Sequence, residues 1–217
     1  MIKGAVFDLD GTITDSNPFW DRVPVIFLES LGIKAEPELG QIIFPMTVPE
    51  AVEYMIERYS LLLTPEEFSE GMQGMIEHFY AEEVELKSGI RDVLDLMKEK
   101  GIAMAIATVT ERDLAWKALQ RHGIADYFSG IVTTDDAGAG KHDPAVYLMA
   151  ADKTGSAPEE TLVFEDALHA LRTAKEAGFI TVGVYDDASR DVQDELRSDA
   201  SLYLPDYKDL SQLAALF

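Results

Sequence analysis

Short apolar runs alternate with segments of helical periodicity from about residue 88 to the C-terminus. The apolar runs predict strands over residues 103–107, 130–132, 162–164, 180–184 and 202–204. The segments between them predict helices over 89–100, 110–123 and 144–154, and one that ends at Gly178. Strands that alternate with helices are typical of a parallel sheet covered on both faces. The predicted fold class is therefore α/β, with a doubly wound, Rossmann-like parallel sheet.

The first part of the chain breaks this alternation. Residues 4–7 form an apolar run that stops at Asp8, which predicts a buried strand emerging at a polar edge. Residues 16–85 show no convincing strand pattern. Apolar residues recur there at helical spacing, at Val52, Met55, Ile56 and Tyr59, and at Phe68, Met72, Met75, Ile76 and Phe79. We therefore expect an all-helical insertion over residues 16–85 in a core made of residues 1–15 and 86–217.

Several residue types predict where helices begin. Asn17 before Pro18 predicts an N-cap followed by a first-turn proline. Pro24 predicts either a kink in the next helix or a delayed start. Residues 64–67, Thr-Pro-Glu-Glu, predict a capping box. Thr110 is expected to cap the helix that runs to Gly123.

Charge and composition narrow the possible partners. Forty acidic and eighteen basic residues give a formal net charge of −22, which disfavours nucleic acid as a partner. A phosphorylated substrate would also be repelled, so its site would need positive charge from a metal ion and a lysine. The absence of cysteine excludes disulfides and thiolate metal sites. The sequence has no apolar run long enough for a transmembrane helix and no signal-peptide pattern, so we expect no membrane partner and a cytoplasmic location.

Polar side chains follow the predicted strands at the points where the strands end. They are Asp8, Asp10, Thr108, Lys141, Glu165 and Asp166. Ligands of doubly wound sheets bind beyond the carboxyl ends of the strands, so these side chains are expected to share one site. Carboxylates are suited to Mg²⁺, and a hydroxyl and an ammonium are suited to phosphoryl oxygens.

The same residues stand in a pattern that resembles the haloacid dehalogenase-like (HAD) superfamily. The run from Asp8 to Thr12, Asp-Leu-Asp-Gly-Thr, matches the first family motif. The other three motifs follow in the family's order: Thr108 after an apolar strand, Lys141 in Gly-Lys-x-x-Pro, and Asp166 after Phe-Glu. The resemblance therefore covers nearly the whole chain. The departures from the family pattern remove no required functional group; they are at Val109, His142, Ala145, Ala167 and Ala170.

The resemblance implies a Mg²⁺-dependent phosphatase with a covalent aspartyl-phosphate intermediate. Asp8 would be the nucleophile, and Asp10 would act as general acid and then as general base. Thr108 and Lys141 would hold the phosphoryl oxygens. The carboxylates of Asp8 and Asp166, with the backbone carbonyl of Asp10, would hold the metal ion.

The predicted insertion resembles the small helical cap of phosphoglycolate phosphatases, sugar-phosphate phosphatases and β-phosphoglucomutase. Such a cap would exclude bulk water and select a small phosphorylated metabolite. Residues 42–50 are the expected specificity loop. The apolar residues Phe19, Trp20, Phe44 and Met46 either line the pocket or pack in the core.

Two alternatives to hydrolysis remain open. A β-phosphoglucomutase-like phosphomutase shares the opening motif, but those mutases carry a histidine where this chain has Trp20. A non-catalytic binding module is disfavoured because both Asp8 and Asp10 are present. For Glu165 the alternatives are contact with the metal through water and orientation of neighbouring groups. Nothing in the sequence requires more than a monomer.

Overall fold

The computed structural model describes residues 1–43 and 45–217, and the chain divides into two compact units. The core unit contains Met1–Asn17 and Val84–Phe217, and the helical insert contains Pro18–Glu83. The two units are described separately below. Phe44, one of the aromatic residues expected in a pocket or in the core, lies outside the described residues.

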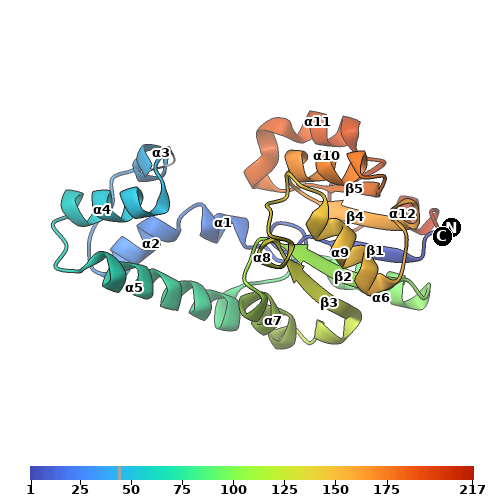
Figure 1. The fold of residues 1–217 in the computed structure, drawn as a ribbon, viewed down its shortest axis with the longest axis horizontal. Helices are drawn as coiled ribbons and strands as arrows, with labels where there is room; N and C mark the ends of the chain where they lie inside the picture. Colours follow the sequence, from blue (N-terminus) through green and yellow to red (C-terminus); the bar gives the residue numbers. More distant parts are fainter. Residues whose placement is uncertain (44) are drawn as a thin grey trace. The chain divides into compact units, whose positions relative to one another are not determined.

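The core unit is built on a six-stranded parallel sheet with the order β3-β2-β1-β4-β5-β6 (Figure 1). Its strands are β1 (Gly4–Phe7), β2 (Ala103–Thr108), β3 (Phe128–Thr133), β4 (Thr161–Glu165), β5 (Ile180–Val184) and β6 (Leu202–Leu204). The predicted α/β class and parallel sheet are confirmed. The third strand begins at Phe128, two residues before the predicted start at 130.

The central position of β1 determines where the polar edge lies. Phe7, at its end, is in register with Ile106 of β2 and with Phe164 of β4. The strand order changes direction here, because β2 and β3 lie on one side of β1 while β4, β5 and β6 lie on the other. Doubly wound sheets bind ligands at such a switch point, beyond the carboxyl ends of the strands.

Seven α-helices of the core unit accompany the sheet. They are α6 (Ile90–Glu99), α7 (Arg112–Arg121), α8 (Thr134–Ala137), α9 (Ala145–Thr154), α10 (Leu168–Glu176), α11 (Gln193–Asp199) and α12 (Ser211–Ala214). Short segments of 3-10 helix add Ala125–Tyr127, Pro158–Glu160 and Asp187–Val192. The predicted helices correspond to α6, α7, α9 and α10. The helices α8, α11 and α12 are too short to show an apolar period: α11 buries only Leu196.

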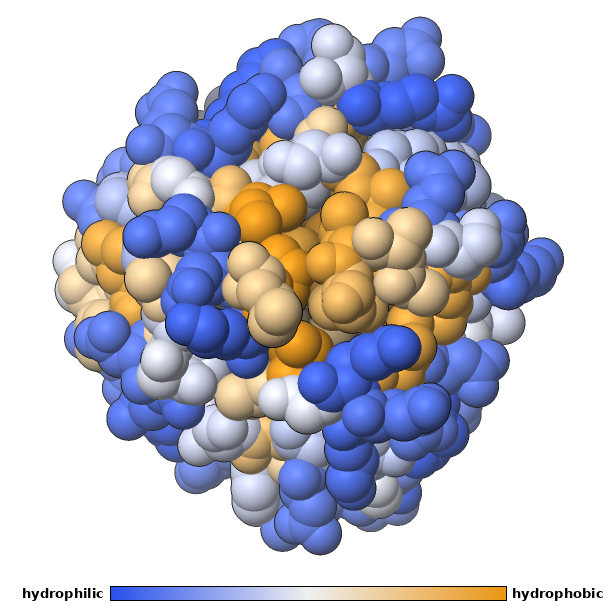
Figure 2. Space-filling model, turned by 90° about the vertical axis from the view of Figure 1, so that its right-hand side faces the viewer, coloured by the Kyte–Doolittle hydropathy of each residue, from blue (hydrophilic) through white to orange (hydrophobic). Residues whose placement is uncertain are grey.

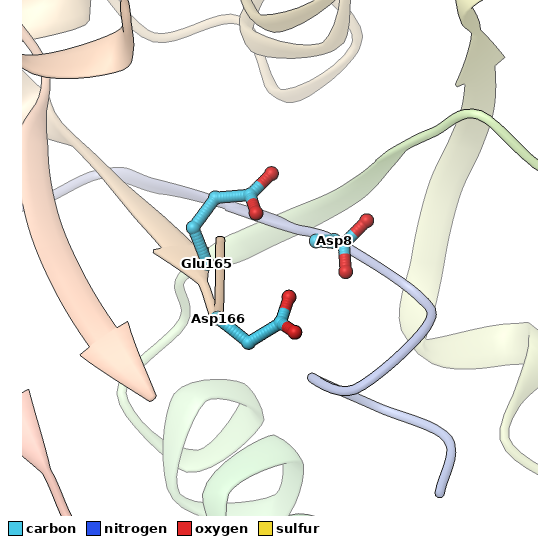
Figure 3. Close-up of side chains that lie close together, drawn as sticks. All are labelled: Asp8, Glu165 and Asp166. Carbon is cyan, nitrogen blue, oxygen red and sulfur yellow. The ribbon is translucent and has the colours of Figure 1, made fainter. Parts of the chain in front are cut away.

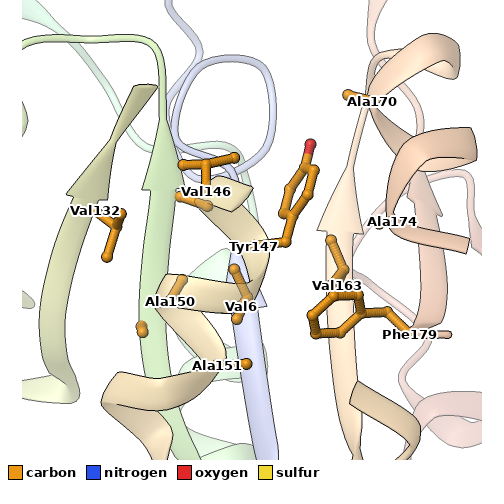
Figure 4. Close-up of a cluster of buried hydrophobic side chains, with 12 residues drawn as sticks. Val6, Val132, Val146, Tyr147, Ala150, Ala151, Val163, Ala170, Ala174 and Phe179 are labelled. Carbon is orange, nitrogen blue, oxygen red and sulfur yellow. The ribbon is translucent and has the colours of Figure 1, made fainter. Parts of the chain in front are cut away.

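Apolar side chains cover β1 on both faces. On one face, Val6 and Val163 belong to a buried cluster with Tyr147 of α9 (Figure 4). Successive strand residues point to opposite faces, and Phe7 therefore lies on the other side, stacked on Phe164 with ring centroids 4.3 Å apart. Burial on both faces explains why residues 4–7 are uniformly apolar.

The helical insert contains helices and, in its described part, no strand. Its helices are α1 (Asn17–Trp20, beginning at the last residue of the core unit), α2 (Val23–Ser30), α3 (Leu39–Ile43), α4 (Val48–Arg58), α5 (Pro65–His78) and a π-helix (Phe79–Glu83). The predicted capping box is confirmed: the Glu67 amide donates to Thr64 Oγ1 at 3.2 Å. Pro24 lies in the first turn of α2, so it begins the helix rather than kinking it.

The predicted apolar stripes of the insert pack together. Its buried cluster is formed by Phe27, Leu28, Leu39, Val52, Met55 and Phe68. Of the residues that were expected either in the core or in a pocket, Phe19 stacks on Phe79 with centroids 3.8 Å apart. Trp20 donates a hydrogen bond to Tyr80 Oη at 2.8 Å and lines a surface pocket with Gln41 and Ile43.

The side of the core unit on which both chain ends lie is apolar at its centre. Hydrophobic residues gather there within a rim of hydrophilic ones (Figure 2). Because Met1 precedes β1, this side is opposite to the carboxyl ends of the strands.

No helix in the described part of the chain is long and apolar enough to cross a membrane.

Candidate active site

Of the six residues expected to share the site, four lie at the carboxyl ends of strands and a fifth, Lys141, lies in a loop. Asp8 directly follows β1, and Thr108 is the last residue of β2. Glu165 ends β4 and Asp166 follows it. Lys141 comes from the loop between α8 and α9. All five side chains are buried, although four of them carry ionisable groups that are normally found at the surface.

Three of these side chains form a compact acidic cluster. The carboxylates of Asp8, Glu165 and Asp166 turn toward a common space (Figure 3). Each offers one oxygen, and these oxygens all lie within 4.8 Å of one another. Bringing three anions together in a buried place is unfavourable unless a cation balances them, so the donor set fits a hard divalent ion.

Lys141 supplies part of that balance. Its ammonium forms ion pairs with Asp8 and with Glu165, the latter at 2.6 Å. Tyr147 also donates to the same Glu165 oxygen, Oε1, at 2.7 Å. Among the described residues the second oxygen, Oε2, accepts no hydrogen bond although it is buried. The site thus has three carboxylates but a single ammonium, and one carboxylate oxygen has no hydrogen-bond donor. A metal ion or ordered water at this place would satisfy both needs.

The pKa values reflect the crowding of negative charge. Burial raises the pKa of Asp8, and Glu165 and Asp166 raise it further, while Lys141 opposes them. The pKa of Asp166 is raised to about 7 by burial and by the charges of Glu165 and Asp186. Burial lowers the pKa of Lys141, but the two adjacent carboxylates outweigh it and leave that pKa raised. The lysine is therefore charged at neutral pH, whereas the raised pKa values of Asp8 and Asp166 favour proton uptake by these two carboxylates in the absence of a metal.

We expect these pKa shifts to make stability depend on pH and metal together. The folded pKa of Asp166 is above its unfolded value, so the resulting stabilisation is complete below about pH 4 and is lost as the pH rises through about 7. Metal-free protein should therefore melt at a lower temperature at about pH 8 than at about pH 5. The Mg²⁺-induced rise in melting temperature should be larger at about pH 8, because metal binding displaces these protons. Metal-free Asp166→Asn should melt with a weaker pH dependence; an unchanged dependence would contradict this origin.

Asp10 lies outside the acidic cluster and has its own hydrogen-bond partners. Ser16 donates to Asp10 Oδ1 and Thr110 donates to Oδ2, both at 2.6 Å. The prediction that Thr110 caps the next helix is wrong, since α7 begins at Arg112 after Glu111. The amide of Thr110 instead donates to Thr108 Oγ1 at 2.9 Å. Ser16 and Thr110 thus determine the direction of the Asp10 carboxylate.

The glycine of the Asp-Leu-Asp-Gly-Thr run has a steric function. Gly11 has a φ of 82°, which side chains other than glycine rarely adopt. A Cβ atom at this position would lie 2.5 Å from Asp166 Oδ2 and would also collide with the Asn17 amide. The backbone after β1 can therefore lie against Asp166 only because residue 11 has no side chain.

Sequence reasoning missed several residues around the cluster. Asn17 is the first residue of α1 rather than its cap, and its amide donates to both Asp166 and Asp186 at 3.0 Å. Asp186 follows β5 closely, so the strand-end argument could have found it. Tyr147 carries no such signal, because on α9 it reads as an ordinary core residue.

Comparison with known proteins agrees with this geometry. The sequence profile of the haloacid dehalogenase-like hydrolases matches residues 5–184. A phosphorylated carbohydrates phosphatase from Thermotoga maritima is 28% identical over 82% of this chain and 82% of its own. A phosphoglycolate phosphatase from Yersinia pseudotuberculosis is 27% identical over 84% of this chain and 81% of its own.

A solved structure resembles the entire chain. It is a Thermotoga maritima protein provisionally described as a β-phosphoglucomutase, with 26% identity, full coverage of both chains and a TM-score of 0.86. The sequence profile, the phosphatase relatives and the parallel sheet with a helical insert lead to the same assignment. The chain belongs to the haloacid dehalogenase-like hydrolase family.

Proposed function

We propose that this enzyme is a Mg²⁺-dependent phosphatase that hydrolyses a small phosphorylated metabolite through an aspartyl-phosphate on Asp8. The observation that carries the proposal is the buried group formed by Asp8, Glu165, Asp166 and Lys141 at the switch point of the sheet. Such a group combines hard oxygen ligands for a divalent ion with an ammonium for phosphoryl oxygens. The relatives named for phosphorylated carbohydrates and phosphoglycolate support the substrate class.

The residues assigned to the metal are the carboxylates of Asp8 and Asp166 and the backbone carbonyl of Asp10. When bound, Mg²⁺ would reduce the repulsion between an anionic nucleophile and an anionic phosphate ester. Glu165 is assigned an orienting role, because its Oε1 accepts from both Lys141 and Tyr147. Its other oxygen, Oε2, is left to accept from water.

In the first step, an Asp8 oxygen attacks phosphorus and the bond from phosphorus to the leaving oxygen breaks. Asp10 gives its proton to that leaving oxygen, and the alcohol departs. In the second step, Asp10 takes a proton from water as the water oxygen attacks the same phosphorus. The bond between phosphorus and Asp8 then breaks, which releases inorganic phosphate and restores both aspartates to their starting states.

Thr108 and Lys141 are assigned to the oxygens of the phosphoryl group. Thr108 Oγ1 accepts from the Thr110 amide, which orients its hydroxyl without using its proton. Lys141 is held on two sides by carboxylates, so its ammonium is already in place before the substrate arrives. Groups prepared in this way stabilise developing charge without reorganising.

The helical insert is assigned the role of a cap, with boundaries proposed at residues 16 and 85. The chain leaves the core unit for the insert at Asn17, whose side chain contacts Asp166. This connection supports a role for the insert at the active site. In this role the insert would exclude water and select the substrate, with residues 42–50 as the specificity loop.

Phosphomutase activity is the second candidate, and the structural similarity to a protein provisionally described as a β-phosphoglucomutase favours it. The position at which those mutases carry a histidine is occupied by Trp20, whose indole donates to Tyr80. An indole N–H is a very weak acid and its nitrogen is not basic, so at neutral pH it cannot act as a general acid or a general base. Hydrolysis is therefore preferred.

Phosphate release from a panel of small esters tests the proposal. The panel contains 2-phosphoglycolate, sugar phosphates, nucleoside monophosphates and β-glucose 1-phosphate, each with and without Mg²⁺. We expect release that requires Mg²⁺ and is strongest for one class of small metabolite. Conversion of β-glucose 1-phosphate to glucose 6-phosphate without release of phosphate would support the mutase instead. A folded protein with neither activity would contradict both enzyme assignments.

A further inference from the structure

A hydrogen-bonded chain of side chains lies behind Asp166. The side-chain nitrogen of Asn17 lies 3.0 Å from Asp166 Oδ2 and 3.0 Å from Asp186 Oδ1. Carboxylates only accept hydrogen bonds, so this atom must be the amide nitrogen, which has one proton for each partner. Asn17 therefore places a neutral double donor between two negatively charged side chains that would otherwise repel each other.

At the end of this hydrogen-bonded series farthest from Asp166, Asp186 is held by a largely buried ion pair. Asp186 forms an ion pair with Lys87 at 2.6 Å, and both side chains are largely buried, with exposures of 4% and 16%. Lys87 also donates to the Tyr185 carbonyl at 2.8 Å, and the Ala188 amide donates to Asp186 Oδ1 at 2.9 Å. Buried charge pairs with additional hydrogen bonds hold a single geometry.

The near end of the chain limits which Asp166 oxygen is available. Asn17 occupies Oδ2, and the backbone carbonyl of Asp166 accepts from Ser189 at 2.8 Å. The close approach of Asn17 to Asp166 also depends on Gly11, where a Cβ atom would meet both side chains. The rotation of the Asp166 carboxylate is thus restrained by contacts outside the acidic cluster.

We propose that Asn17, supported by Asp186 and Lys87, is a positioning residue that orients the Asp166 carboxylate for the metal ion; this inference rests on the proposed function. None of the three side chains is assigned to the substrate or to the metal itself. Partners behind a metal ligand typically contribute about 10- to 100-fold to metal affinity by orienting it. This series of hydrogen-bonded side chains joins the two segments of the core unit, because Lys87 and Asp186 belong to one segment and Asn17 to the other.

For Lys87, a purely electrostatic effect on Mg²⁺ affinity would have the opposite sign to a positioning effect. Removing the positive charge of Lys87 makes the region more negative, which by itself would strengthen the binding of a cation. If Lys87 acts by anchoring Asp186, its removal should weaken that binding, because Asn17 loses its fixed partner. The sign of the change therefore separates positioning from simple electrostatics.

The test is calorimetric titration of the full-length protein with Mg²⁺ alone, at fixed pH and ionic strength. Asn17→Ala is expected to weaken Mg²⁺ binding by about 10-fold or more, and Lys87→Met by a smaller factor in the same direction. Lys3→Met is the matched control, because it removes one positive charge from an exposed pair with Glu160 at the other end of β1. It should leave the affinity unchanged. Circular dichroism of each variant checks that the fold is retained.

The outcomes of this titration distinguish failure of the positioning role from failure of the proposed function. Wild-type affinity in both Asn17→Ala and Lys87→Met, or tighter binding in Lys87→Met, overturns the positioning role while leaving the proposed function intact. If Asn17→Ala does not fold, the direction of the change in Lys87→Met decides alone. Failure of the wild-type protein itself to bind Mg²⁺ overturns the proposed function, and the inference with it.

Discussion

Replacing Asp8 by Asn is expected to reduce phosphate release by about 10⁴-fold or more. The amide that replaces the carboxylate is a poor nucleophile, so it cannot form the phosphoryl bond. The substitution also removes one negative charge from the acidic cluster. Steady-state phosphate release with the best ester of the panel, at saturating Mg²⁺, measures the effect.

The fold of Asp8→Asn should survive, which makes the comparison meaningful. Lys141 keeps its ion pair with Glu165, and the repulsion of Asp8 by Glu165 and Asp166 is removed. Circular dichroism and the melting temperature of the metal-free protein check this point. Residual release at more than a few per cent of the wild-type rate, from a pure and folded variant, would mean that water attacks the ester directly and that Asp8 is not the nucleophile.

Replacing Asp10 by Asn is expected to have the second largest effect, a loss of about 10²- to 10⁴-fold with alkyl phosphates. The side-chain amide of this variant can still form hydrogen bonds with the hydroxyls of Ser16 and Thr110, because a hydroxyl both donates and accepts. The geometry is therefore largely preserved while proton transfer is lost. Both chemical steps need this proton, since the leaving alkoxide must be protonated and the attacking water must be deprotonated.

An aryl ester separates the two steps. The nitrophenolate of 4-nitrophenyl phosphate leaves without a proton, so Asp10→Asn should release a burst of nitrophenol equal to the enzyme present. The second step should then be slow, and phosphorylated enzyme should accumulate on Asp8, detectable by mass spectrometry. Thr110→Val is the matched control, because it removes one hydrogen bond from Asp10 but leaves the carboxylate. It should show a smaller loss and no accumulation; a burst of the same size in Thr110→Val would argue against a proton-transfer role.

Much of the fold could be predicted from local patterns. The inner strands β1, β2, β4 and β5 are buried along nearly their whole length, so their mainly apolar runs are visible in the sequence. The helices α6, α7, α9 and α10 are long enough to show an apolar stripe, whereas α8, of four residues, is not. The order of the strands in the sheet was not specified from the sequence, because it depends on which surfaces cover one another.

The site could be predicted in part, for a related reason. Asp8, Glu165 and Asp166 stand at strand ends, and the parallel sheet places these ends at one edge. Asn17 and Thr110 were interpreted as helix caps instead. Asparagine and threonine favour caps because their short polar side chains bond to nearby backbone, and the same property suits them to hold a carboxylate from a distant segment. Local sequence contains no information that separates the two uses.

The sequence by itself determined the parallel α/β class, the helical insertion, the family resemblance and the residue types at the polar edge. Each of these depends on short-range periodicity or on short motifs and the order in which they follow one another along the chain. Only the tertiary structure decided which side chains contact each other: Lys141 with Asp8 and Glu165, and Asn17 with Asp166 and Asp186. These partners are far apart in the chain, and their proximity follows from packing of the entire core unit, which no local pattern encodes.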